Sequence, residues 1–237
     1  MQKLFFLCYN CVQEGDYMKA LVFDLDGTLL NTIEDLKIAV NHAITKYGYN
    51  EISSDDDKSY IGNGIKNLVK RSLGNDLTYL DEAFEAFKEY YFYNCNNKTT
   101  VYDGIYDVID YAKKNNYLLA CVSNKNSYCL NFLVDYFFKD TFSVVIGDGD
   151  GFKKKPAPDV IIECAKRLNI DVCDIIYIGD SDVDVKTVIN SKCKGIFVDY
   201  GYRKKEELIN SGADVILSSP LEIIKILGDE NYGYRND

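Results

Sequence analysis

The feature that most constrains the fold is a regular alternation of short apolar segments and amphipathic segments from residue 105 to the end of the sequence. The apolar segments are rich in β-branched residues, which is typical of buried strands, and the segments between them have helical spacing. We expect strands at Tyr117–Val122, Phe142–Ile146, Asp174–Ile178, Gly195–Val198 and Ala213–Ile216. We expect helices at Ile105–Lys114, Tyr128–Phe137, Asp159–Leu168, Val183–Ser191, Lys204–Ile209 and Leu221–Leu227. This alternation predicts an α/β fold of Rossmann-like type, a parallel sheet with helices on both faces.

One more strand, Lys19–Asp24, precedes this region and is separated from it by a stretch that is helical throughout. Its helices are expected at Glu34–Tyr47, from Ile65 to near Gly74, and at Asp81–Tyr93. Because the first strand belongs with the others, the stretch between them is an inserted all-helical cap domain. We therefore divide the chain into an N-terminal extension (1–17), a core (18–31 and 100–237) and a cap (32–99), with linkers near Asn31 and Thr100.

The composition is that of a globular protein with an acidic surface. Hydrophobic residues make up 47% of the chain, which is enough to bury a core, and the formal net charge is −10. A negative surface repels a phosphate backbone, so we expect no nucleic-acid partner. An anionic substrate would need a local source of positive charge, and a bound divalent cation is the simplest one.

The remaining expectations concern location and assembly. The eight cysteines have no repeating spacing, which favours reduced thiols in a cytoplasmic protein. The apolar run Leu4–Leu7 is too short for a signal-peptide core or a membrane span, so we expect no membrane association. The acidic charge and the lack of a long exposed apolar run predict a monomer or a weak homodimer.

Polar residues follow the strands at the edge where an open parallel sheet binds its ligands. They are Asp24, Asp26 and Thr28 after the first strand, Ser123 and Asn124 after the second, Lys155 beyond the third, and Asp180, Ser181 and Asp184 after the fourth. Clustered carboxylates stay ionised only beside a cation, and hard oxygen ligands suit Mg²⁺. A lysine and a hydroxyl would bind phosphoryl oxygens, and Gly27 would let backbone amides approach an anion. The edge therefore indicates phosphoryl chemistry.

The arrangement Asp24-Leu25-Asp26-Gly27-Thr28, then Ser123, then Lys155-Pro156, then Gly179-Asp180-Ser181 with Asp184, resembles the haloacid-dehalogenase superfamily. The resemblance spans residues 18–228 and all four motifs occur in order. It implies that Asp24 is the nucleophile, that Asp26 is the general acid and base, and that Lys155 completes the catalytic set. It implies Mg²⁺ held by Asp24, by the backbone carbonyl of Asp26 and by Asp180, with Asp184 in support. Phosphoryl oxygens would be held by Thr28, Ser123, Asn124 and Lys155.

The helical insertion is similar to the superfamily's small helical cap, which closes over the site and selects the substrate. Within it, Ile61-Gly62-Asn63-Gly64 and Leu68 are similar to the cap loop of phosphoglycolate phosphatases, so Gly62, Asn63 and Gly64 are candidate substrate contacts. A simple helix–helix turn would explain that loop equally well. Tyr102 departs from the family pattern, which usually has proline there. The resemblance implies a Mg²⁺-dependent phosphatase that hydrolyses a small-molecule phosphate monoester, phosphoglycolate-like, through an aspartyl-phosphate. The alternatives are a sugar-phosphate mutase, a pyrophosphatase or 5′-nucleotidase of the same fold, and a non-catalytic binding protein.

Overall fold

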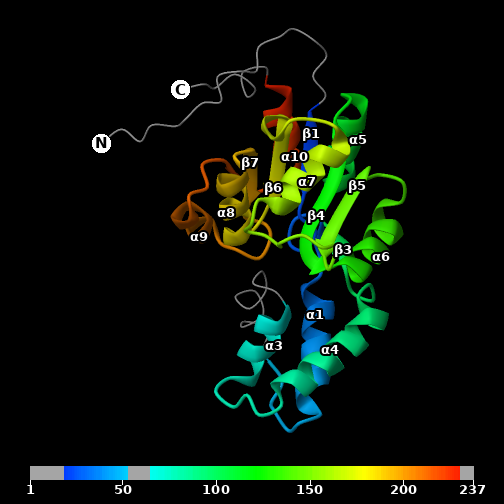
Figure 1. Ribbon diagram of the computed structural model, residues 1–237, viewed down its shortest axis with the longest axis vertical. Coiled ribbons are helices and arrows are strands. Elements are labelled where there is room, and N and C mark those ends of the chain that lie inside the picture. Colours follow the sequence, from blue (N-terminus) through cyan, green and yellow to red (C-terminus); the bar gives the residue numbers. More distant parts are fainter. Residues whose placement is uncertain (1–18, 53–64, 230–237) are drawn as a thin grey trace.

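The structure, a computed structural model, describes residues 19–52 and 65–229. Its main sheet contains six parallel strands in the order β5-β4-β1-β6-β7-β8. The strands are β1 (Ala20–Phe23), β4 (Leu118–Asn126), β5 (Val144–Asp148), β6 (Ile175–Gly179), β7 (Lys194–Val198) and β8 (Ile216–Leu217). The predicted α/β class is confirmed, and the first strand lies in the middle of the sheet as expected (Figure 1).

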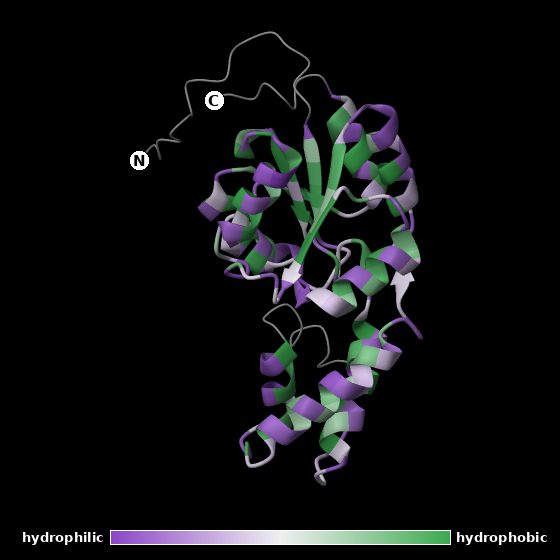
Figure 2. Ribbon diagram, turned by 45° about the vertical axis from the view of Figure 1, so that its right-hand side comes forward, coloured by the Kyte–Doolittle hydropathy of each residue, from purple (hydrophilic) through white to green (hydrophobic). Residues whose placement is uncertain are grey.

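Helices cover both faces of the sheet because the strands are apolar on both sides. Leu21 and Phe23 of β1 face one buried cluster, and Ala20 and Val22 face the other. The first face is covered by α5 (Ile105–Lys114), α6 (Ser127–Phe138) and α10 (Pro220–Gly228). The second face is covered by α7 (Asp159–Leu168) and α8 (Asp182–Ser191), with α9 (Lys205–Ser211) packed beside α8. Figure 2 shows the hydrophobic strands enclosed between these helices.

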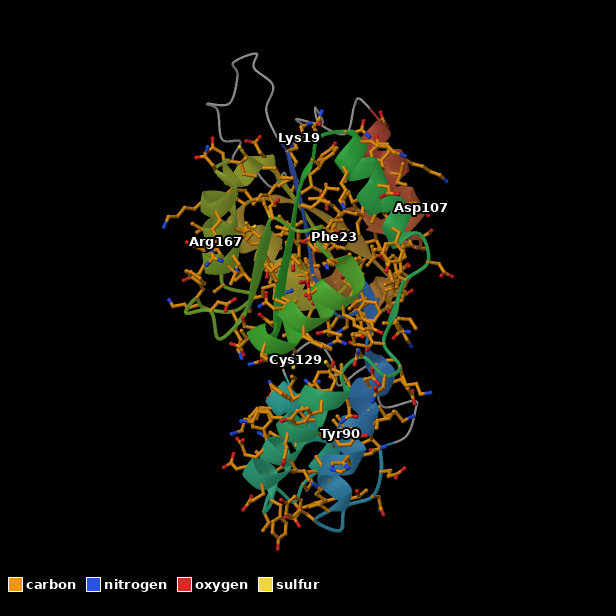
Figure 3. All side chains as sticks on the ribbon, turned by 90° about the vertical axis from the view of Figure 1, so that its right-hand side faces the viewer. Lys19, Phe23, Tyr90, Asp107, Cys129 and Arg167 are labelled. Carbon is orange, nitrogen blue, oxygen red and sulfur yellow. The ribbon has the colours of Figure 1, made fainter. Side chains whose placement is uncertain are left out.

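Three further helices form a group of their own, which we call the helical block: α1 (Ile33–Thr45), α3 (Ile65–Leu73) and α4 (Leu80–Asn94). They pack on one another through buried side chains such as Val40, Val69 and Phe87. Figure 3 shows β1 running from Lys19 to Phe23 toward this block. The block therefore lies beyond the carboxyl ends of the strands. The domain boundaries given above, and the extension 1–17, stay predictions, and residues 1–17 lie outside the described ranges.

The two linkers between the sheet and the helical block pair with each other. β2 (Leu30–Asn31) and β3 (Thr100–Val101) form a two-stranded antiparallel ladder. The sequence placed linkers at these positions but predicted no pairing, because two residues are too few for a period-two pattern.

Two other local differences from the sequence-based expectation matter for the site. β4 continues to Asn126, four residues past the expected end at Val122, and Asn126 pairs with Asp148 of β5. A short 3₁₀ helix (η1, Val172–Asp174) comes immediately before β6.

In residues 19–52 and 65–229, no helix is both long and apolar enough to cross a membrane.

Candidate active site

The predicted catalytic side chains meet at the carboxyl edge of β1, β4 and β6. Lys155 Nζ lies 3.0 Å from Asp24 Oδ1 and 2.7 Å from Asp184 Oδ1. A pocket at this edge is lined by Asp24, Asp26, Ser123, Asn124, Lys155 and Asp180, among other residues. The order of the strands explains this meeting, because β1 lies between β4 and β6 and all three point the same way.

Asp24 is buried at the end of β1, and its environment controls its charge. Burial raises the pKa of Asp24 to about 6, Lys155 opposes that rise, and Asp184 adds to it. The backbone amide of Leu25 donates to Asp24 Oδ1 at 2.8 Å. The pKa of Asp24 therefore stays above its ordinary value despite the adjacent Lys155.

The carboxylates at this edge have the composition of a divalent-cation site. One oxygen from each of Asp24, Asp180 and Asp184 lies within 4.8 Å of the other two. Burial, followed by the nearby charges of Asp184 and Asp24, raises the pKa of Asp180 well above its ordinary value. Three buried carboxylates around one lysine leave a surplus of negative charge, and a hard cation with oxygen ligands would neutralise it. The residues present therefore fit Mg²⁺.

Asp180 is fixed by close backbone contacts. Its Oδ2 accepts a hydrogen bond from the Tyr202 amide at 2.7 Å, and the Thr28 hydroxyl donates to Oδ1 at 3.4 Å. Gly27, at φ +81°, leaves the space that Asp180 fills, since a Cβ there would lie 2.2 Å from Asp180 Oδ2. The Gly27 amide donates to the Leu30 carbonyl at 2.8 Å. In this structure Gly27 thus makes room for a carboxylate, and its own amide is already paired. The hydroxyl of Thr28 likewise faces Asp180.

Asp184 lies beneath the pocket and uses both carboxylate oxygens within the protein. Oδ2 accepts from the amide and the hydroxyl of Ser181, at 3.0 and 2.6 Å, in the capping box that begins α8. Oδ1 accepts from Lys155 at 2.7 Å and from the Tyr177 hydroxyl at 2.9 Å. Four donors leave Asp184 suited to support the metal site and Lys155, as the sequence suggested, more than to coordinate a metal directly.

Lys155 is buried and held by oxygen atoms on three sides. Besides the two carboxylates, the Tyr177 hydroxyl lies 2.7 Å from its Nζ. Burial alone would lower the pKa of Lys155, but Asp184 and Asp24 outweigh it and raise that pKa above the ordinary value. The lysine therefore stays a cation, which places a fixed positive charge beside Asp24.

Asn124 and Ser123 follow each other in β4 and differ in what they can offer. Ser123 is buried and makes a side-chain hydrogen bond with Asp24 that lowers the pKa of that carboxyl. The Asn124 amide nitrogen donates to the Lys155 carbonyl at 2.9 Å, which ties the lysine's loop to β4. Asn124 Oδ1 is buried without a hydrogen-bond partner among the described atoms. Phosphoryl binding by the Asn124 side chain stays a prediction, and the bond to Lys155 uses one of the two N–H donors of the amide.

Asp26 faces a different set of partners from Asp24. Its Oδ1 accepts from the Thr32 hydroxyl at 2.6 Å and from Lys125 Nζ at 2.9 Å. The sequence reasoning missed Lys125, although it lies in the same short segment as Ser123. β4 continues to Asn126 with a register shift against β5 between Val122 and Asn126, and Lys125 is buried within this continuation. A lysine that follows an apolar run is ordinarily solvated, so only the longer strand reveals that Lys125 belongs to the site.

The cap residues Gly62, Asn63 and Gly64 lie outside the described residues, so their predicted substrate contacts stay predictions. Tyr202 and Tyr177 are further residues that sequence reasoning missed. Tyr202 contributes its amide to Asp180 and its hydroxyl to Thr32, and Tyr177 contributes its hydroxyl to Lys155 and Asp184. Neither belongs to a short motif, so no sequence signal marked them.

Comparison with known proteins agrees with this geometry. A phosphoglycolate phosphatase of Nitrosospira multiformis is 31% identical over 89% of this chain and 96% of its own length, and one of Aquifex aeolicus is 28% identical over 89% and 97%. The crystal structure of a candidate phosphoglycolate phosphatase from Lactobacillus delbrueckii subsp. bulgaricus matches with a TM-score of 0.83 and 31% identity, over 88% of this chain and 98% of that one.

The family model for haloacid dehalogenase-like hydrolases matches residues 21–198, a range that contains every described residue of the predicted motifs. The resemblance first read from four short motifs is confirmed by this match and by the relatives above. The chain belongs to the haloacid dehalogenase-like hydrolase family.

Proposed function

We propose that this protein is a Mg²⁺-dependent phosphatase that hydrolyses small-molecule phosphate monoesters through an aspartyl-phosphate on Asp24. The observation that carries the proposal is the buried Asp24 carboxylate, with Lys155 at 3.0 Å and two further carboxylates within 4.8 Å. A nucleophile beside a fixed cation and a divalent-cation site suits attack on a phosphorus atom that carries negative charge. The family membership and the phosphoglycolate phosphatases among the relatives support the same reaction.

Each step has a residue of this chain to perform it. An Asp24 oxygen attacks phosphorus, and the bond from phosphorus to the ester oxygen breaks as Asp26 gives that oxygen a proton. Asp26 then takes a proton from water, the water oxygen attacks phosphorus, and the bond to Asp24 breaks to release inorganic phosphate. Lys155 offsets charge on the phosphoryl oxygens through both steps.

The metal ion would be held by Asp24, by the backbone carbonyl of Asp26 and by Asp180, with Asp184 in support through Ser181. When bound, Mg²⁺ would neutralise phosphoryl charge and stabilise the charge that develops in the transition state. Lys155, held by Asp184 and Tyr177, stays in place whether or not a metal is bound, so its contribution is preorganised.

Phosphoglycolate is the first substrate to test, because several relatives are named for that activity. We also propose that the helical block acts as a cap over the site, since it lies beyond the carboxyl ends of the strands. A cytoplasmic location and a monomeric or weakly dimeric state complete the proposal, on the cysteine content and charge described above.

The test is phosphate release from a panel of monoesters and pyrophosphate, with and without Mg²⁺, beside an Asp24→Asn control. The panel contains phosphoglycolate, nucleoside monophosphates, hexose phosphates and p-nitrophenyl phosphate. We expect release that requires both the metal and Asp24. Release that survives Asp24→Asn, or no release from folded, Mg²⁺-bound protein, would contradict the proposal. Phosphate transfer to sugar without net release would favour the mutase.

A further inference from the structure

Lys125 is a buried cation that the mechanism above does not use. Its side chain is 1% exposed, and its Nζ lies 2.9 Å from Asp26 Oδ1 and 3.2 Å from Oδ2. The same Nζ donates to the Tyr91 hydroxyl at 2.8 Å and lies 4.7 Å from the centre of that ring. An ammonium group has three donor hydrogens, so one lysine can hold Asp26 and Tyr91 together.

The contacts to Asp26 are unequal between its two oxygens. Oδ1 receives both the Thr32 hydroxyl, at 2.6 Å, and Lys125 at the shorter of its two distances. Among the described residues, Oδ2 receives one hydrogen bond, from Lys125 at 3.2 Å. The two donors on Oδ1 fix the plane of the carboxyl group and occupy the lone pairs of that oxygen. Oδ2 is then the oxygen with capacity to carry the proton that a general acid transfers.

The partners of Asp26 connect it to the helical block. Thr32 is the residue before α1, and its hydroxyl also contacts the Tyr202 hydroxyl at 2.8 Å. Tyr91 lies in α4, where it is buried and stacked on Phe87 with ring centres 5.3 Å apart. Lys125 comes from β4, so its hydrogen bond to Tyr91 joins the sheet to the helical block at the general acid itself.

We propose that Lys125 is the positioning residue for Asp26, and that the Tyr91 hydroxyl fixes Lys125 when the helical block is docked on the sheet. This inference rests on the proposed phosphatase function, in which Asp26 protonates the leaving oxygen. A general acid works only within hydrogen-bond reach and with its proton aimed at the acceptor, so an error in its orientation lowers the rate. The helical block would then contribute to proton transfer as well as to substrate selection.

The test compares two leaving groups, because only one of them needs a proton. An alkoxide leaves poorly unless it is protonated, whereas p-nitrophenolate leaves readily as an anion. We would measure kcat/KM, which includes the step in which the leaving group departs, for p-nitrophenyl phosphate and for an alkyl monoester that the panel shows to be turned over. In Lys125→Met we expect the alkyl value to fall at least about tenfold more than the p-nitrophenyl value.

A second variant guards against the case in which Lys125→Met does not fold. Tyr91→Phe keeps the stacked ring and removes the hydroxyl, so it should fold and show the same selective loss at a smaller size, about threefold. Tyr106→Phe is the matched control, because it removes a hydroxyl bonded to the Phe137 carbonyl at 3.0 Å, far from the pocket. We expect no change in either substrate for that control.

A double-mutant cycle with Asp26→Asn decides whether Lys125 acts through Asp26. If Lys125 acts through Asp26, Lys125→Met should cause little further loss in that background. Equal losses for both substrates, or a full additional loss in the Asp26→Asn background, would overturn the inference while leaving Asp24-dependent phosphate release intact. Failure of the proposed function is a different result, since it removes Asp24-dependent release from the wild-type protein.

Discussion

At the scale of single residues, two glycines let the site form at all. Gly27 and Gly201 each leave room for Asp180, since a Cβ on Gly201 would lie 2.5 Å from Asp180 Oδ2. Asp180 in turn accepts the Tyr202 amide, so the carboxylate is enclosed by backbone on two sides. Together with the Thr28 hydroxyl, this enclosure fixes the Asp180 carboxylate, a proposed metal ligand, and it explains the glycine that follows the Asp-x-Asp segment.

A substitution of Gly27 tests that explanation. In Gly27→Ala the new Cβ would meet Asp180 Oδ2 at 2.2 Å, so we expect displacement of the carboxylate and a loss of Mg²⁺ affinity of at least about tenfold, which calorimetric titration measures. Gly48→Ala is the control, because Gly48 has nearly the same φ, +83° against +81°, and nothing lies within 4 Å of its Cβ. Both variants share the backbone strain, about 1 kcal/mol, but only the first should lose metal affinity.

The charge of Asp24 gives a prediction for pH. Its pKa of about 6 is raised above the ordinary value of 3.8, mainly by burial. Protons and Mg²⁺ compete for the ionised carboxylate, so the protonated fraction rises and the metal affinity falls as the pH drops through 6. Titration calorimetry at pH 7.5 and pH 5 should show affinity at least about tenfold weaker at the lower pH. Equal affinity at both values would count against Asp24 as a ligand.

At the scale of elements, one buried carboxylate of α1 joins the start of the helical block to the segment that ends it. Asp35 of α1 is 2% exposed and accepts hydrogen bonds from the amides of Lys98 and Thr99 and from the Thr99 hydroxyl, all at 2.8–2.9 Å. These bonds join the start of the block to its end, immediately before β3 pairs with β2. The two chain segments that connect the sheet to the helical block are therefore held together as one unit.

Asp35→Ala should weaken this unit. The substitution leaves the Lys98 and Thr99 donors without their acceptor, so we expect the free energy of unfolding to fall by about 2 kcal/mol, measured by urea denaturation. Asp81→Ala is the comparison, because it removes an exposed ion pair with Lys66 and should change stability little. Similar effects for the two variants would show that Asp35 does not join the linkers.

The elements also show why the sequence predicted most of the fold and only part of the site. Helix α7 falls at Asp159–Leu168 as predicted, because both its apolar spacing and its ends are marked locally. The end of β4 was missed because Ser123–Asn126 is a polar run, and such a run is typical of loops. Lys125 was missed for the same reason. The contact between Lys125 and Asp26 joins residues 99 positions apart, which no local pattern encodes.

At the scale of the whole molecule, the candidate site gathers side chains from distant parts of the sequence at one edge of the sheet. Asp24, Lys155 and Asp180 come from three separate parts of the chain, and β1 brings them together at the centre of the sheet. Lys155 and Lys125 are buried cations in a protein whose net charge is −10, and each is bound to the carboxylate of a residue that we propose to be catalytic. The two ammonium groups thus offset part of the negative charge that Asp24, Asp26, Asp180 and Asp184 place at this edge.

The most direct test of the central claim is to detect phosphate on Asp24 during turnover. The reaction would be stopped rapidly, an acyl phosphate would be reduced with borohydride, and the peptide containing residue 24 would be analysed by mass spectrometry. We predict conversion of Asp24 to homoserine in the wild-type protein only when substrate and Mg²⁺ are both present, and no conversion in Asp24→Asn. Active turnover with unmodified Asp24, or with modification at another carboxylate, would contradict the account.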